Sequence, residues 1–106
     1  MHPTQIIKSK NKALKLRRLA RDRDCEIRIP GVCCGDAGTV VLCHLPGAGI
    51  ARKHNDLFGA YGCAKCHDAV DGRTKTDFPR EMLKLWHLEA VIRTQQILID
   101  EGILRV

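Results

Sequence analysis

The sequence predicts a small α+β domain with a short basic helix at its start and a long helix at its end. Three observations support this prediction. Residues 39–45 are β-branched and apolar, which is typical of a buried strand. Residues 79–101 are good helix formers with apolar residues at helical spacing. Six cysteines lie in 106 residues that are only 4% aromatic, so a thin core needs a cross-link.

The excess of positive charge lies in residues 1–24. They hold eight Lys or Arg against two Asp, whereas the rest of the chain balances ten basic with ten acidic side chains. We expect a basic arm over 1–24, with a helix from about residue 12, and a single domain over 25–106 with its core at 25–73. Such a block of charge attracts polyanions without reading their sequence. The alternative is a solvated tail that aids solubility.

The order of the local elements follows from pattern and turn residues. Residues 25–29 alternate polar and apolar side chains, which predicts a half-buried strand. Pro30-Gly31 predicts a turn. The strand at 39–45 should end at or near His44, and a polar loop follows it. A short helix is expected over 64–70, and the long helix over about 79–101 should pack through Met82, Leu85, Trp86, Leu88, Ile92 and Ile99. Residues 103–106 either add a strand or tuck into the core.

Four cysteines have the spacing of zinc ligands. Cys63 and Cys66 lie three apart, as in a zinc knuckle at a helix start. Cys25 and a cysteine after the Pro30-Gly31 turn would complete a Cys₄ site, and we favour Cys33 over Cys34. With no apolar leader or membrane stretch in this sequence, we expect the cytoplasm, where metal ligation is commoner than a disulfide. The alternative is that these cysteines are buried and bind no metal.

A family resemblance emerges from the order of these elements. The chain is similar to the HNH, or ββα-metal, endonucleases with a treble-clef-like zinc core. It resembles more closely the small phage and prophage nucleases of the YbcO type. The residues that carry the resemblance are Cys25-Glu26-Ile27-Arg28-Ile29-Pro30-Gly31-Val32-Cys33, His44-Leu45, Lys53 with Asp56-Leu57, Cys63-x-x-Cys66-His67-Asp68 and Asp71-x-Arg73.

The resemblance implies a metal-dependent DNA endonuclease that acts in phage recombination or DNA processing. His44 would be the general base. His67 and Asp71 would bind a catalytic Mg²⁺ or Mn²⁺. Asp56, or its neighbour Asn55, would hold the loop and orient His44. The expected phosphate contacts are Lys53 and Arg73, with Arg17 and Arg18 from the basic arm. DNA is the expected partner, and a recombinase filament is a further one.

Two features leave other interpretations open. Cys43 precedes the expected base where the family often has a metal ligand suited to Mg²⁺, and sulfur is a poor ligand for that ion. His67 could instead replace a cysteine in a Cys₃His zinc site. The alternative function is therefore a zinc-containing DNA-binding or adaptor module without catalysis, and a third is a phage protein that binds a host protein.

Overall fold

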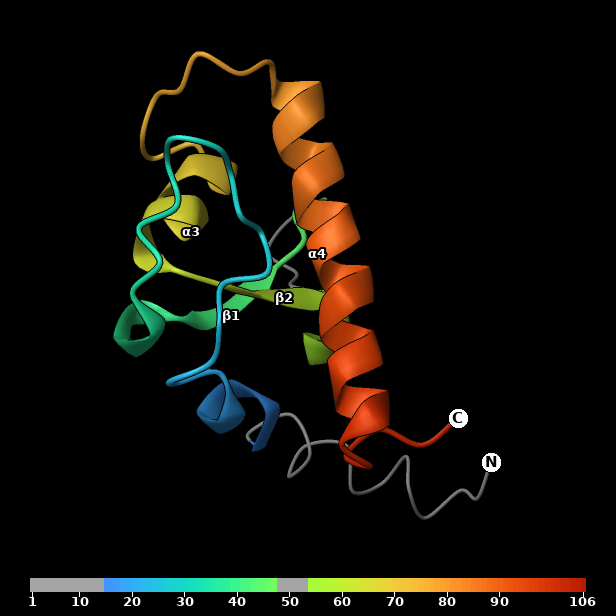
Figure 1. Cartoon of the computed structure of the whole chain (residues 1–106). Helices are drawn as coiled ribbons and strands as arrows, with labels where there is room; N and C mark the ends of the chain where they lie inside the picture. Colours follow the sequence, from blue (N-terminus) through green and yellow to red (C-terminus); the bar gives the residue numbers. More distant parts are fainter. Residues whose placement is uncertain (1–14, 48–53) are drawn as a thin grey trace.

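An antiparallel pair of strands lies at the centre of the structure, a computed structural model that describes residues 15–47 and 54–106 (Figure 1). Val41 pairs with Gly62, and His44 pairs with Gly59. In chain order the elements are η1 (Ala37–Thr39), β1 (Val41–His44), η2 (Asp56–Phe58), β2 (Gly59–Gly62), α3 (Ala64–Val70) and α4 (Arg80–Asp100). Both predicted C-terminal helices are confirmed, α3 with the expected bounds and α4 one residue shorter at each end.

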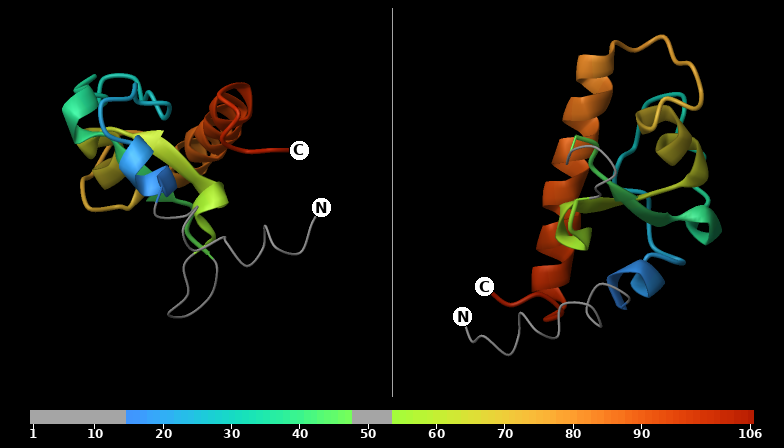
Figure 2. Two further views of the ribbon diagram at one scale, coloured as in Figure 1. Left: turned by 90° about the horizontal axis from the view of Figure 1, so that it is seen from below. Right: turned by 180° about the vertical axis from the view of Figure 1, so that it is seen from behind.

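The hairpin joins the other elements. Two further views show α4 crossing the hairpin, with α3 at the C-terminal end of β2 (Figure 2). Residues 15–19 are helical, within the predicted basic helix. That prediction is wrong at its C-terminal end, because residues 20–22 form turns and Asp22 has a φ of 66°. Residues 12–14 lie outside the described residues. The Tyr61 hydroxyl on β2 donates a hydrogen bond to the Leu16 carbonyl (3.3 Å). None of the described helices is both long and apolar enough to span a membrane.

The predicted strand over residues 25–29 is wrong. Four of its five side chains are buried, and Arg28 has a φ of 54°, which a strand does not accommodate. Only one bond links the segment to β2, from the Glu26 N–H to the Tyr61 carbonyl (2.7 Å). The predicted turn is confirmed, because Gly31 has a φ of 72° and the Val32 N–H bonds the Ile29 carbonyl (3.1 Å). The segment is therefore a knuckle that positions Cys25 and the residues after the turn.

The predicted apolar face of α4 is wrong at most of its positions, although Trp86 is partly buried against the core. Leu85 and Ile92 are 49% and 61% exposed, and the buried face instead contains Leu83, His87, Ala90, Val91, Thr94 and Leu98. The physical reason is that α4 packs on backbone polar groups as well as on side chains. Thr94 Oγ1 accepts the Tyr61 N–H (3.1 Å), and His87 Nε2 donates to the Cys43 carbonyl (2.9 Å). These groups would otherwise be buried without partners.

The last turn of α4 is closed by the residues that follow it. The N–H groups of Ile103 and Leu104 both bond the Leu98 carbonyl, at 2.9 and 3.1 Å, and their side chains pack against the core. Of the two expectations for this segment, tucking into the core is therefore the one observed. Arg23 reaches the same end of α4 and pairs with Glu101 (2.5 Å).

Gly62→Ala is expected to destabilise the fold. A Cβ added at Gly62 would lie 2.5 Å from Ile27 Cδ1 and 3.0 Å from Cys43 Sγ, and both of those side chains are buried. Overpacking of this kind costs about 1–3 kcal/mol. Urea unfolding would measure the loss, with Gly38→Ala on the exposed η1 turn as the control. Equal stability of the two variants would show that the Ile27 side chain repacks freely.

Candidate functional site

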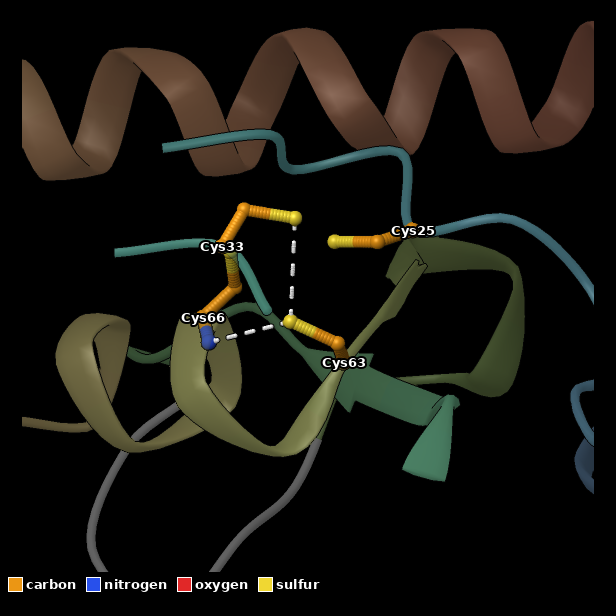
Figure 3. A group of neighbouring side chains, drawn as sticks. All are labelled: Cys25, Cys33, Cys63 and Cys66. Carbon is orange, nitrogen blue, oxygen red and sulfur yellow. Dashed lines mark hydrogen bonds between the residues drawn. The ribbon is translucent and has the colours of Figure 1, made fainter. Parts of the chain in front are cut away.

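The four predicted cysteines lie together at the start of α3. The sulfurs of Cys25, Cys33, Cys63 and Cys66 lie within 4.8 Å of one another and point toward a common centre (Figure 3). A tetrahedral zinc site with Zn–S bonds of about 2.3 Å places its sulfurs about 3.8 Å apart. The Cys63–Cys33 sulfur distance is 3.8 Å. The cluster is therefore consistent with a structural zinc site.

Two short backbone motifs build this cluster. Cys63 is the N-cap of α3, and its sulfur accepts the Cys66 N–H (3.5 Å). On the other side, the Cys33 N–H bonds the Ile29 carbonyl (2.9 Å), which closes the turn around Gly31. The start of α3 therefore supplies the sulfurs of Cys63 and Cys66, and the segment around the Gly31 turn supplies those of Cys25 and Cys33.

The clustered thiols also change one another's protonation. A hydrogen bond from Cys66 lowers the pKa of Cys25 to about 4, and the same contact raises the pKa of Cys66. Burial raises the pKa of Cys33 to about 11. Four thiolates this close repel one another unless a dication binds them, and that charge is what zinc supplies.

The remaining two cysteines lie outside the cluster. Cys34 is exposed, and its sulfur lies 3.8 Å from Thr39 Oγ1. Cys43 is fully buried in β1, and burial raises its pKa. The cysteine that precedes the predicted base therefore does not face the solvent-accessible side of β1. His67 is also outside the four-sulfur cluster, which leaves the Cys₃His alternative without support from the geometry.

The end of β1 presents His44 against a buried carboxylate. His44 Nε2 donates to Asp56 Oδ1 (2.6 Å), and Arg17 donates to both Asp56 oxygens at 3.0 and 3.1 Å. Burial by itself raises the pKa of Asp56, but the bonds from His44 and Arg17 outweigh it and leave that pKa below its usual value. The carboxylate therefore stays ionised and fixes the orientation of the His44 ring.

The neighbouring Asn55 caps the turn η2 and does not take part in the contact between Asp56 and His44. Its side chain accepts the Leu57 N–H (2.9 Å) and caps η2. Of the two residues that the sequence left open, Asp56 contacts the histidine and Asn55 holds the turn. Gln95 on α4 donates to the Leu57 carbonyl (2.5 Å) and anchors the same turn from the other side.

A second pair of groups lies on α3 and at its end. His67 Nε2 is 3.1 Å from Asp71 Oδ2, and Arg73 contacts the same carboxylate oxygen at 2.6 Å. A cleft of about 530 Å³ brings this pair together with the His44 side chain. Arg17, Leu42, His44, Leu45, Pro46, Gly47, His67, Asp71 and Arg73 line it.

The predicted site residues are thus brought together in part. Asp56, expected to orient His44, contacts that histidine and does not line the cleft. Arg17, predicted to contact phosphate, is the ion-pair partner of Asp56 and also lines the cleft. Arg18 is exposed, and Lys53 lies outside the described residues. Within residues 15–47 and 54–106, the cysteines form the only cluster of three or more metal-ligand side chains.

His87, which the sequence did not single out, contacts the strand that ends in His44. Its side chain is 2% exposed and bonds the carbonyl of Cys43, the residue before His44. Burial lowers the pKa of His87, which favours the neutral ring. The signal for it is weak: a histidine at helical spacing from small and polar residues such as Ala90 and Thr94.

A family model described as "Putative nuclease YbcO" matches residues 14–103. The chain belongs to the YbcO family. Its match covers all four clustered cysteines and the cleft residues. The resemblance identified from the sequence is thereby confirmed.

Individual relatives of the YbcO family agree with this assignment. The chain is 38% identical over 96 residues to "Putative nuclease YbcO" of Escherichia coli K12 and equally to "Putative nuclease ybcO" of Enterobacteria phage 82. These alignments cover 85% of this chain and 96% of each relative. A solved structure titled "Structure of a putative bacteriophage protein", from Escherichia coli K-12 MG1655, is 39% identical with a TM-score of 0.70. The match covers 83% of this chain and 100% of that one. Relatives from a bacterium and from a phage make the family phage-related.

Proposed function

We propose that the protein is a metal-dependent DNA endonuclease that processes phage or prophage DNA in the cytoplasm of a bacterial host. One observation carries the proposal: His44, held by Asp56, lines the same cleft as the His67–Asp71 pair. The order β1, β2, α3 supports a ββα-metal core of the HNH-like type, with structural zinc at the four cysteines. The family name "Putative nuclease YbcO" supports the same reaction class.

His44 is proposed as the general base. Because the ionised Asp56 carboxylate only accepts hydrogen bonds, Nε2 of His44 carries the proton in their contact. The other ring nitrogen, Nδ1, then has the lone pair and can take a proton from water. Arg17 donates to both Asp56 oxygens and balances the negative charge of that carboxylate. The carboxylate therefore stays in place to orient the His44 ring.

His67 and Asp71 are proposed to hold the catalytic ion. A nitrogen and a carboxylate oxygen suit Mg²⁺ or Mn²⁺ better than sulfur does. Mg²⁺ is commonly held by one or two carboxylates, with substrate phosphate and water completing its shell. Two protein ligands are therefore enough. When bound, such an ion polarises the phosphate and stabilises the departing 3′-oxygen.

Basic side chains would supply the grip on the DNA backbone. Arg17 and Arg73 line the cleft, and exposed Arg18 belongs to the basic arm. Lys53 completes the predicted phosphate contacts. Contacts of this kind bind any DNA sequence and weaken as salt rises. A recombinase filament remains the proposed partner where naked DNA is not the substrate.

One observation favours a second candidate, a zinc-containing DNA-binding or adaptor module without catalysis. Cys43 stands where related enzymes often have a metal ligand, and its buried thiol cannot reach the cleft. In that case His44 and Asp56 would serve only to hold η2 against β1.

His44→Ala is expected to abolish cleavage of plasmid and single-stranded DNA in Mg²⁺ or Mn²⁺, while DNA binding stays close to wild type. Loss of a general base costs about 10²–10⁴-fold in rate. One arm of the experiment uses DNA coated with a recombinase. His54→Ala is the matched control, since His54 bonds the Pro46 carbonyl (3.2 Å) and does not line the cleft.

Three outcomes separate the candidates. Cleavage by wild type and His54→Ala, but not by His44→Ala, supports the nuclease and its base. Equal cleavage by all three proteins refutes the assignment of His44. DNA binding without cleavage in every arm favours the non-catalytic module.

A further inference from the structure

An apolar groove adjoins the polar cleft. It has a volume of about 310 Å³ and lies between α4, the end of α3 and the segment after β1. Leu45, Val70, Leu83 and Leu88 form most of its apolar wall. Leu45, Pro46 and Gly47 line both hollows, so the groove and the cleft share one wall. The groove therefore lies directly beside the cleft.

Two cationic side chains border the groove. Lys84 is exposed on α4, and Arg80 reaches across to α3, since its Nη1 lies 3.4 Å from the place of a Cβ on Gly72. Gly72 precedes Arg73, which lines the polar cleft. Positive charge therefore continues from the cleft to the groove. Among the described residues, no carboxylate pairs with Arg80 or Lys84.

We propose that this groove binds one unpaired base of the DNA strand whose phosphate lies in the polar cleft. The inference rests on the proposed function and adds a substrate class to it. An apolar hollow with a cationic border matches a nucleotide, which has an apolar ring face beside an anionic phosphate. Ligand pockets start at about 300 Å³, so the groove has room for a single base and is too small for a duplex.

The proposal predicts a preference for single-stranded, mismatched or frayed DNA. A base in a duplex must leave its stack and its partner before it can enter such a groove, and this cost falls when the base is already unpaired. The polar cleft alone would bind phosphates of paired and unpaired strands alike.

The test compares two leucines on α4. Leu88 and Leu85 are 48% and 49% exposed, three residues apart, but only Leu88 lines the groove. Leu88→Glu and Leu85→Glu therefore add the same charge at similar exposure. The probes are a short single-stranded oligonucleotide with one 2-aminopurine and the corresponding duplex. Lys84→Gln is a second variant at the groove.

We expect Leu88→Glu to weaken binding of the single strand about tenfold, the scale of one lost base contact. Lys84→Gln should weaken it less. Leu85→Glu should match wild type, and the duplex should bind all four proteins similarly. Binding should also change the 2-aminopurine emission for wild type and Leu85→Glu but not for Leu88→Glu.

Equal single-strand binding by Leu88→Glu and Leu85→Glu would overturn the groove assignment, and so would a wild type that binds the duplex as tightly as the single strand. These results are independent of cleavage. Cleavage lost in His44→Ala together with equal binding by the two Glu variants would leave the nuclease standing and remove the groove. Single-strand binding that depends on Leu88, with no cleavage by wild type, would keep the groove and remove the nuclease.

Discussion

Cys66→Ser is expected to unfold the domain. The Cys66 side chain is fully buried, and its sulfur belongs to the four-cysteine cluster. Structural zinc contributes about 10 kcal/mol or more to folding, whereas whole domains are stable by only about 5–15 kcal/mol. Loss of one ligand, or chelation of the metal, should therefore remove most of the native state. Far-UV circular dichroism, urea unfolding and zinc content would measure it.

Cys34→Ser is the matched control for this prediction. Cys34 follows a cluster ligand directly in sequence but is exposed and outside the cluster. The variant should keep one zinc per chain and the wild-type unfolding curve. A chelated protein, or a Cys66→Ser protein, that retained the native spectrum and a cooperative transition would show that the cluster is a packed group of thiols.

Asp56→Asn is expected to slow cleavage by about 10²–10⁴-fold. The amide keeps the size of the carboxylate but has no negative charge. In the wild type that charge accepts the hydrogen bond from His44 Nε2–H and the two hydrogen bonds from Arg17. The proton of the His44 ring is then no longer fixed on Nε2. The lone pair on Nδ1, which would take the proton from water, is lost in part of the molecules. Single-turnover cleavage at saturating enzyme would measure this step directly.

DNA affinity and zinc content should stay near wild type in Asp56→Asn, because Asp56 does not line the cleft and lies outside the cluster. Arg17→Gln removes the other partner of Asp56 while keeping the His44 contact, so its single-turnover rate at saturating enzyme should fall less. Its DNA affinity should fall as well, because Arg17 lines the cleft. A rate loss in Asp56→Asn that merely follows lost DNA binding or lost zinc would identify Asp56 as a structural residue.

Local chemistry made part of this structure predictable. The i, i+3 cysteine spacing and the Pro30-Gly31 turn indicated Cys25, Cys63, Cys66 and a fourth ligand at Cys33 or Cys34, because zinc knuckles have few backbone solutions. The structure places the favoured Cys33 in the cluster. Helix α3 was predictable for the same reason, since Cys63 caps it and Gly72 ends it with a φ of 76°.

Contacts over long sequence separation were not predictable. The buried face of α4 depends on which backbone groups of the hairpin need partners, and periodicity does not contain this information. The Arg17–Asp56 pair joins residues 39 apart, so the order of motifs placed Asp56 near His44 but gave no indication that Arg17 would reach it. Residues 25–29 alternate like a strand, yet the positive φ of Arg28 turns them into a knuckle.

The contact between Gln95 and the Leu57 carbonyl bears on the order in which the parts of the chain fold during synthesis. Ribosomes extend a chain from its N-terminus at about 5–20 residues per second, so all four clustered cysteines are synthesised about 1–6 seconds before Thr94 and Gln95. A nascent chain can therefore capture its metal while the η2 turn still lacks its α4 anchor. Metal binding would come first as the chain folds during synthesis, and the placement of Asp56 beside His44 would come last.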